Sequence, residues 1–206
     1  MKTESINSPS LSPACTYRER SYDSSNCIVE RPYVNWKILV LSFIEKFRKL
    51  SEDPLERLTE MGVKEGMIFL DVRCALGFYS FPAASIVGEK GLVYALDINA
   101  DFTKYVSEKA KKKGIKNTKA ITAKAENTGL SSQSVDIVFL HLVLHDIEDK
   151  QRAVKEFNRI LKARGKLIID EENVIPLNFI RRLAEETGFR LSKILRKTIQ
   201  IFERDR

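Results

Sequence analysis

Acidic side chains and small residues follow two of the apolar, strand-like segments of the sequence. Asp71 lies near the end of one such segment, and the turn after it, Arg73-Cys-Ala-Leu-Gly77, is rich in small residues. Such a turn lets the backbone approach a ligand at the amino end of a following helix. Asp97 ends the next segment, twenty residues beyond Gly77, where a carboxylate can accept both hydroxyls of a ribose. Together they are typical of a nucleotide site, although either carboxylate can equally close a turn.

Four further side chains with acid–base chemistry follow later strand-like segments. His145 and Asp146 come after the fourth segment, and Glu171 and Glu172 come after the fifth. Ligands of open α/β sheets bind at the carboxyl ends of strands, so these groups are expected near the mouth of a site. There a general base can take a proton from a substrate. His145, Asp146 and Glu171 are therefore candidates for catalysis, with a structural or capping role as the commoner alternative for His145.

The elements that must position these residues follow an alternating pattern. Short runs rich in β-branched residues alternate with segments of helical periodicity, which predicts an α/β fold with a mostly parallel sheet and helices on both faces. Strands are expected at Ile68–Val72, Leu92–Ile98, Thr118–Ala123, Val135–Leu144 and Lys166–Asp170, and helices at Tyr79–Val87, Asp101–Lys113 and Gln151–Ala163.

The C-terminal segment changes this pattern. A helix is expected over Leu177–Thr187, closed by Gly188, and two further strands over Leu191–Leu195 and Thr198–Phe202. The link between these strands is too short for a crossover, so they must form an antiparallel hairpin.

The N-terminal segment divides into two parts. Residues 1–30 are rich in Ser, Pro, Asn and charge, which predicts a flexible extension. Residues 31–62 predict a helical preface, with one helix over Trp36–Leu50 and a second that starts near Pro54. The remaining chain, residues 31–206, is expected to be a single domain.

Composition excludes several classes of protein. Of 206 residues, 43% are hydrophobic and 31% are charged, as in ordinary globular proteins. The longest apolar stretches are too short to cross a membrane, and no secretory signal is apparent, so we expect a cytoplasmic protein. Three cysteines and two histidines predict neither a disulfide framework nor a structural metal, although a thiol site stays open as a minor alternative.

Much of the net charge of +7 comes from one segment. Eight lysines lie between Lys104 and Lys124, against the single acid Glu108. Lysines neutralise phosphates, so nucleic acid is a possible partner. No aromatic residues alternate with them for base stacking, and a solvated helix face is favoured instead. The many lysines and three glutamines are also typical of a heat-adapted source.

Five blocks in order over about 110 residues resemble the class I S-adenosylmethionine-dependent methyltransferases, and among them the small archaeal-type methyltransferase-domain proteins. The resemblance implies a Rossmann-like sheet and S-adenosylmethionine as cofactor. The blocks are Phe69-Leu-Asp-Val with Cys74-Ala-Leu-Gly-Phe-Tyr-Ser, Gly88 to Asp97, Ala125-Glu-Asn-Thr-Gly-Leu, Ser134 to His145, and Glu156 to Ile169.

The resemblance also implies which residues contact the cofactor. The methionine end would lie over the turn 71–77, the ribose on Asp97, and the adenine beside Ile98 with further contacts from Ala125 and Glu126. His141 and Leu142, at the end of the fourth expected strand, would form a further wall of the cofactor site. The full implied set is Asp71, Arg73, Cys74, Ala75, Gly77, Asp97, Ile98, Ala125, Glu126, His141 and Leu142.

Three positions depart from the family pattern. Glycine is usual where this chain has Arg73 and Ala75, and Asp is common at Lys124, where it holds the adenine amino group. Lysine has no acceptor and cannot replace that contact. The Arg73 guanidinium can obstruct the cofactor, turn outward, or pair with the methionine carboxylate. The sequence leaves these open, with a slight preference for obstruction or outward rotation.

The function that the resemblance implies is methyl transfer to a small molecule, with the N-terminal helices over the substrate side. Such displacement needs positioning more than dedicated catalytic groups. No Asn-Pro-Pro-Tyr run is present, which argues against the enzymes that methylate amino groups of nucleic-acid bases and of glutamine. Two alternatives stay open: a degenerate fold that serves as a non-catalytic binding module, suggested by Arg73 and Lys124, and an RNA methyltransferase, suggested by the lysines. The sequence does not indicate the acceptor or the oligomeric state.

Overall fold

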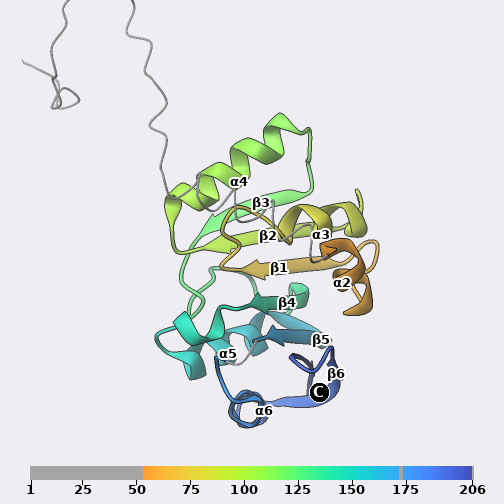
Figure 1. Ribbon diagram of the computed structural model, residues 1–206. Coiled ribbons are helices and arrows are strands. Elements are labelled where there is room, and N and C mark those ends of the chain that lie inside the picture. The colour runs from red at the N-terminus through yellow and green to blue at the C-terminus, as the bar shows by residue number, and fades with distance from the viewer. Residues whose placement is uncertain (1–52, 172–173, 206) are drawn as a thin grey trace, which may run out of the picture. The chain divides into compact units, whose positions relative to one another are not determined.

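The computed structural model of the protein describes residues 53–171 and 174–205. Its centre is a seven-stranded sheet in the order β3-β2-β1-β4-β5-β7-β6 (Figure 1). The strands are β1 (Ile68–Val72), β2 (Leu92–Asp97), β3 (Thr118–Thr122), β4 (Val135–His141), β5 (Leu161–Asp170), β6 (Phe189–Leu195) and β7 (Ile199–Arg204). The helices are α2 (Pro54–Glu60), α3 (Ser80–Val87), α4 (Ala100–Lys112), α5 (Lys150–Ile160) and α6 (Leu177–Glu185), with a 3₁₀ turn η1 (Leu144–Asp146).

Both faces of the sheet are buried, because neighbouring residues of its central strands point to opposite sides. In β1, Phe69 belongs to the apolar cluster that contains α2 and α3 residues, whereas Leu70 belongs to the cluster that contains α5 and α6 residues. In β4, Val138 and Phe139 divide in the same way. This is the physical reason for the near-continuous apolar runs in the sequence.

The α/β fold and the direction of its strands agree with the sequence-based prediction. Strands β3, β2, β1, β4 and β5 are parallel. Strand β7 is antiparallel to both β5 and β6, so the expected C-terminal hairpin is confirmed. The expected helix after β1 begins at Ser80, one residue late, and helix α4 begins at Ala100, one residue early.

The structure corrects three details of the expected alternation. Residues 123–134, between β3 and β4, contain no helix, so this crossover is a loop. Strand β4 ends at His141, because Leu142 adopts a positive φ of 52° and the chain turns into η1. Helix α5 ends at Ile160, and Leu161 already pairs with Val135, ahead of a bulge that leads into the expected strand 166–170.

Several sequence-based predictions lie outside the described residues. These are the flexible extension 1–30, the helix Trp36–Leu50 and the side chain of Glu172. The helix predicted near Pro54 is α2, with Asp53 as its N-cap. Among the described helices, none is long and apolar enough to cross a membrane.

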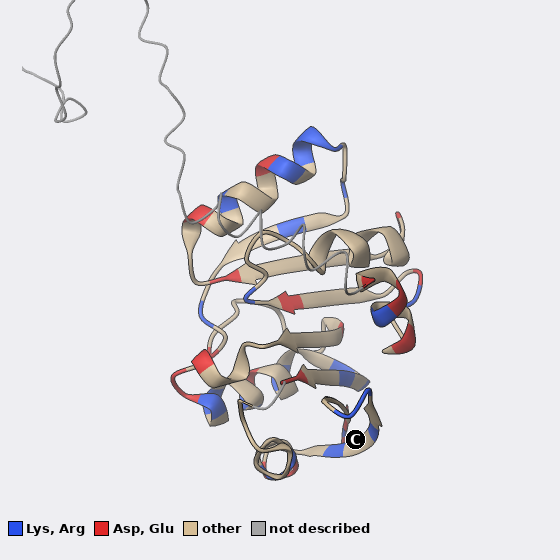
Figure 2. Ribbon diagram, viewed as in Figure 1, with Lys and Arg blue, Asp and Glu red and all other residues tan. Residues whose placement is uncertain are grey.

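The parallel strands bring their carboxyl ends to one edge of the sheet. Figure 2 shows acidic residues at the arrowhead ends of β1 and β2, and basic residues at the far end of α4. Because α4 runs back against the strand direction, its C-terminal lysines lie at the opposite edge of the sheet from those arrowheads. The acidic edge is therefore the place to look for a site.

Candidate functional site

A cavity of about 530 Å³ opens at the carboxyl ends of β1, β2 and β4. Its volume lies in the usual range for small-molecule sites. Its walls come from the turn after β1, the turn after β2, and the segment from the end of β4 into η1. The lining residues are Asp71, Val72, Arg73, Cys74, Ala75, Phe78, Tyr79, Asp97, Ile98, Asn99, Phe102, His141, Leu142, Val143 and Asp146.

The turn after β1 has the backbone geometry that glycine favours. Arg73, Ala75 and Gly77 have positive φ values of 60°, 46° and 81°. A Cβ atom at Gly77 would lie 2.6 Å from the ring of Phe81, so any larger residue there requires the ring to shift. Arg73 and Ala75 keep the left-handed conformation without being glycine, which costs free energy at both positions.

Asp97 ties the turns after β1 and β2 together. Its side chain is buried, and its Oδ2 accepts a hydrogen bond from the Ala75 amide at 3.1 Å while Oδ1 accepts one from the Asn99 amide at 2.9 Å. Each carboxylate oxygen has a second lone pair, so Asp97 can accept further hydrogen bonds from a ligand in the cavity. The turn-closing role and the ligand-binding role, posed as alternatives by the sequence, are compatible in this geometry.

Asp71 lies at the base of the cavity and fixes the start of α3. The Ser80 hydroxyl donates a hydrogen bond to its Oδ2 at 2.5 Å, and both side chains are buried. Tyr79, the residue that precedes α3, packs its ring edge-on against His141, with 5.0 Å between the ring centroids. The β1 side of the cavity is thereby joined to β4.

His141 is held by a buried carboxylate. Its Nδ1 lies 2.6 Å from Oδ2 of Asp170, whose side chain has no exposed surface. Arg57 of α2 forms a close ion pair with the same oxygen, and the Thr198 hydroxyl donates to Oδ1 at 3.0 Å. Three segments that are distant in sequence therefore orient one imidazole at the cavity wall.

The environment of Asp170 keeps it ionised. Burial raises the pKa of its carboxyl, but the hydrogen bond with His141 and the positive charge of Arg57 lower it more, so the net pKa lies below the usual value for aspartate. A charged Asp170 pairs with the buried Arg57 and holds the His141 ring in place through their hydrogen bond.

His145 is held by Glu171, the residue that directly follows β5. Its Nδ1 lies 3.1 Å from Oε2 of Glu171, and the buried Glu171 accepts backbone hydrogen bonds from Val143 and Leu144 through Oε1, at 2.9 and 2.5 Å. These bonds fix the start of η1. Glu171 therefore acts in the structure as an anchor for the loop after β4.

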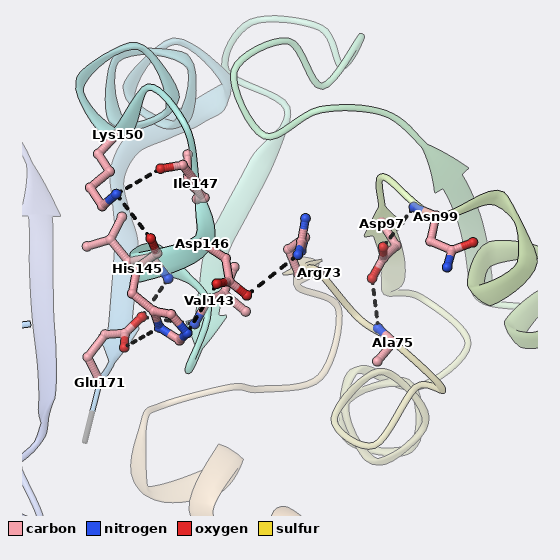
Figure 3. Close-up of polar contacts among 11 residues, drawn as sticks. Arg73, Ala75, Asp97, Asn99, Val143, His145, Asp146, Ile147, Lys150 and Glu171 are labelled. Carbon is pink, nitrogen blue, oxygen red and sulfur yellow. Dashed lines mark hydrogen bonds and ion pairs between the residues drawn. The ribbon is translucent and has the colours of Figure 1, made fainter. Parts of the chain in front are cut away.

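Arg73 and Asp146 connect the opposite walls of the cavity (Figure 3). Nη2 of Arg73 lies 3.6 Å from Oδ2 of Asp146, and Oδ1 of Asp146 lies 3.4 Å from Nε2 of His145. The Arg73 side chain is 33% exposed and that of Asp146 is 55% exposed. The contacts form a polar chain from the β1 turn through Asp146 and His145 to Glu171.

The structure brings most of the sequence-predicted residues together, but not all. Ala125 is buried in the apolar core, and Glu126 lies with Lys124 and Glu148 in a separate hollow. The residues that line the cavity do not include Gly77, His145 or Glu171. The predicted residues that line the cavity are Asp71, Arg73, Cys74, Ala75, Asp97, Ile98, His141, Leu142 and Asp146.

Sequence reasoning missed the contribution of Asp170 and its partner Arg57. Asp170 has the same sequence pattern as Asp71 and Asp97, an acidic residue near the end of a buried strand. The sequence-based prediction instead named the next residue, Glu171. Arg57 gave no signal, because nothing local distinguishes it from a surface arginine of an amphipathic helix. Tyr79 gave none either, since a tyrosine at a helix start is ordinary.

Comparison with known proteins identifies a family whose model matches most of this chain. The family model of the methyltransferase domain matches residues 63–199, which include every strand up to the start of β7. A demethylmenaquinone methyltransferase of Geobacillus sp. (strain WCH70) is 27% identical over 165 residues, which are 80% of this chain and 63% of that protein.

A second relative is similar at the same level. A ubiquinone/menaquinone biosynthesis C-methyltransferase of Shewanella sp. (strain ANA-3) is 30% identical over 145 residues, which are 70% of this chain and 57% of that protein. The chain thus spans about three fifths of the length of these relatives. Among solved structures, a SAM-dependent methyltransferase from Aquifex aeolicus matches with a TM-score of 0.66 and 27% identity, over 77% of this chain and 96% of that one.

Proposed function

This chain belongs to the methyltransferase-domain family, and on that premise we propose that it transfers the methyl group of S-adenosylmethionine to a small organic molecule. One observation carries the proposal: the cavity combines a left-handed turn after β1 with the backbone-anchored carboxylate of Asp97 after β2. That pairing of a close-approach turn and an acceptor for ribose hydroxyls suits an adenosine ligand.

The cavity fits this cofactor in both shape and chemistry. Ile98 and Phe102 offer apolar surface beside Asp97 for a base, and the cavity is large enough for a nucleoside with an amino-acid end. The cofactor supplies an activated methyl group when bound. Its proposed contacts are Asp71, Arg73, Cys74, Ala75, Asp97, Ile98, His141 and Leu142, with Gly77 supporting the turn from behind.

Adenine contacts from Ala125 and Glu126 have no support from the described geometry. Ala125 is 6% exposed within the apolar core, and the Glu126 carboxylate accepts a hydrogen bond from the Asp149 amide at 3.3 Å, in a separate hollow. Lys124 pairs with Glu148 at 3.8 Å. We therefore assign recognition of the base edge to the turn after β2 rather than to this loop.

Two groups in the cavity can take a proton from a methyl acceptor. Asp146 is the one residue of the three catalytic candidates that lines the cavity, and His141 is the second group, held by Asp170. His145 and Glu171 act on Asp146 and on the backbone of η1, so their role is to position. The reaction itself depends mainly on alignment of the two reacting groups.

The methyl acceptor is proposed to be small and at least partly apolar. Besides the residues assigned to the cofactor, Phe78, Tyr79 and Val143 also line the cavity, so part of its remaining lining is apolar. By their descriptions, the relatives named above are a demethylmenaquinone methyltransferase and a ubiquinone/menaquinone biosynthesis C-methyltransferase, and a quinone-like aromatic acceptor suits such a surface.

The lysines of α4 favour an RNA substrate less than the sequence alone suggests. Helix α4 begins beside the cavity, and its last turn, with Lys109, Lys111 and Lys112, lies at the opposite edge of the sheet. A nucleic acid bound to these lysines would therefore lie at the edge of the sheet opposite the cavity. The small-molecule proposal needs no such path.

Titration calorimetry with S-adenosylhomocysteine tests the proposal. We expect micromolar-range binding, and Asp97→Ala should weaken it by about 1.5 to 3 kcal/mol, because charge-assisted hydrogen bonds to the ribose are lost. The matched control is Glu89→Ala, which removes an exposed acid at the opposite edge of the sheet and should leave affinity unchanged. Absence of heat at millimolar ligand would refute the enzyme proposal and favour a non-catalytic binding module.

A further inference from the structure

Arg73 is an unusual residue in the wall of the cavity. It is the only lysine or arginine among the described residues that line the cavity, and it has a φ of 60°, a conformation that disfavours any residue with a Cβ. Strain of this kind persists where the surrounding structure requires it, often at ligand sites. The position therefore places a permanent positive charge in the cavity at a cost in backbone free energy.

The contact that Arg73 makes is a weak one. Within residues 53–171 and 174–205, its ion-pair partner is Asp146, at 3.6 Å. Charge-assisted hydrogen bonds of arginine with a carboxylate are shorter, about 2.7–2.9 Å, and are often bidentate. Because both side chains are partly exposed, water screens the pair. The guanidinium thus has capacity for a second, better carboxylate.

Asp146 does not depend on Arg73 alone. Its other oxygen faces Nε2 of His145 at 3.4 Å, and His145 in turn contacts Glu171. If another carboxylate takes the guanidinium, Asp146 keeps a polar neighbour on its own wall. Displacement of Asp146 therefore leaves no isolated charge in the cavity.

The other charged residues of the cavity favour binding of a ligand carboxylate at Arg73. The lining includes the carboxyl groups of Asp71 and Asp97, which repel an anion. The Arg73 guanidinium is turned toward η1, whereas Asp97 lies on the other side of the β1 turn (Figure 3). A ligand that places hydroxyls on Asp97 can therefore place a negative group on Arg73.

We propose that Arg73 binds the carboxylate of the ligand's amino-acid end, and that Asp146 is the internal carboxylate which this group replaces. The inference rests on the proposed function, because it takes the ligand to be S-adenosylmethionine or its product. It assigns a binding role to the residue that departs most from the family's glycine. The competing interpretation is that the side chain obstructs the cofactor.

Two ligands that differ in the amino-acid end separate these interpretations. S-adenosylhomocysteine carries that end, and 5′-methylthioadenosine has the same adenosine and sulfur without it. Both are titrated by calorimetry against the full chain and against Arg73→Gly, Arg73→Lys and Asp146→Asn. Circular dichroism confirms that each variant is folded.

Carboxylate binding predicts a ligand-specific pattern. Arg73→Gly should weaken S-adenosylhomocysteine about 10- to 100-fold and change 5′-methylthioadenosine less than about twofold. The affinity of Arg73→Lys for S-adenosylhomocysteine should lie between those of the wild type and Arg73→Gly, because lysine keeps the charge but loses the bidentate geometry. Asp146→Asn should tighten S-adenosylhomocysteine alone, since the internal competitor loses its charge.

Other patterns overturn the inference. Tighter binding of both ligands by Arg73→Gly would establish obstruction, and equal weakening of both would make Arg73 a support of the turn. In either case the wild type still binds S-adenosylhomocysteine, so the proposed function survives. If the wild type binds neither ligand at millimolar concentration, the proposed function fails together with this inference.

Discussion

The two walls of the cavity are built by different means. The wall after β1 and β2 is a backbone structure, in which left-handed residues and the Asp97 carboxylate hold the turns. The wall after β4 and β5 is a side-chain structure, in which Asp170 and Glu171 each hold one of the two histidines of the chain.

The difference shows how each wall responds to change. A backbone wall tolerates most side chains, provided that the φ angle and the space at Cβ permit them. A wall of buried ion pairs is sensitive to the loss of one partner, because the other charge then lies buried without compensation. Substitutions in the second wall should therefore have the larger effect on stability.

The largest effect is expected from Asp170→Ala. The substitution removes the carboxylate that faces Arg57, His141 and Thr198, and it leaves a buried guanidinium. We expect the free energy of unfolding to fall by about 3–5 kcal/mol, measured by urea denaturation. The control Glu60→Ala breaks an exposed pair with Arg196 and should shift the midpoint little. Similar effects of the two would contradict the division between the walls.

Low pH should lower the free energy of unfolding, because Asp170 in the second wall becomes protonated. The pKa of Asp170 is lower in the folded protein than its ordinary value of 3.8, so the charged form adds stability above that pH. This contribution is lost as the pH falls through the folded pKa. Between about pH 5 and about pH 2, unfolding free energies of the wild type should drop more than those of Asp170→Asn. Parallel curves would mean that another carboxyl dominates.

In the first wall, Gly77→Ala should have a smaller but clear effect. The new Cβ would adopt a left-handed conformation 2.6 Å from the Phe81 ring, and we expect a loss of about 2–3 kcal/mol. Gly66→Ala is the matched control, since Gly66 also has a positive φ of 79° but no atom within 4 Å of the added Cβ. It should cost about 1 kcal/mol, from the backbone alone. Equal losses in denaturation would show that Phe81 moves aside.

The smallest effect, of opposite sign, is expected at Ala75. Its φ of 46° is unfavourable for alanine, and its amide donates to Asp97 whichever residue is present. Ala75→Gly should therefore raise the free energy of unfolding by up to about 1 kcal/mol. The same replacement at Ala83, buried within α3, should lower it by about 1 kcal/mol or more. Destabilisation by both would show that left-handed strain at Ala75 is negligible.

Local patterns were sufficient to predict the order of most elements. Buried strands of parallel sheets are short, continuous apolar runs, and these gave the positions of β1, β2 and β3 within a residue or two. The loop between β3 and β4 was harder to predict, because parallel strands that follow each other in the sequence usually have a helix between them. The end of β4 was also missed, since Leu142 and Val143 are as apolar as the strand, and only the φ angle of Leu142 reveals the turn.

The sequence by itself determined the first wall of the site. Its residues, from Asp71 to Gly77 and at Asp97, lie next to the strands that position them, so spacing along the chain was enough to bring them together. The family pattern at these strand ends depends on local backbone geometry, which is why it survives in a short motif even where Arg73 and Ala75 replace glycine.

Only the tertiary structure decided the second wall. Arg57 lies 113 residues from Asp170 in the sequence, whereas His141 and Thr198 lie 29 and 28 residues from it, and no spacing rule relates these residues. The same holds for the Arg73–Asp146 contact, which joins two loops across the sheet edge. Pairing of buried charges depends on which helices and strands pack together, and that is a property of the whole core rather than of any one segment.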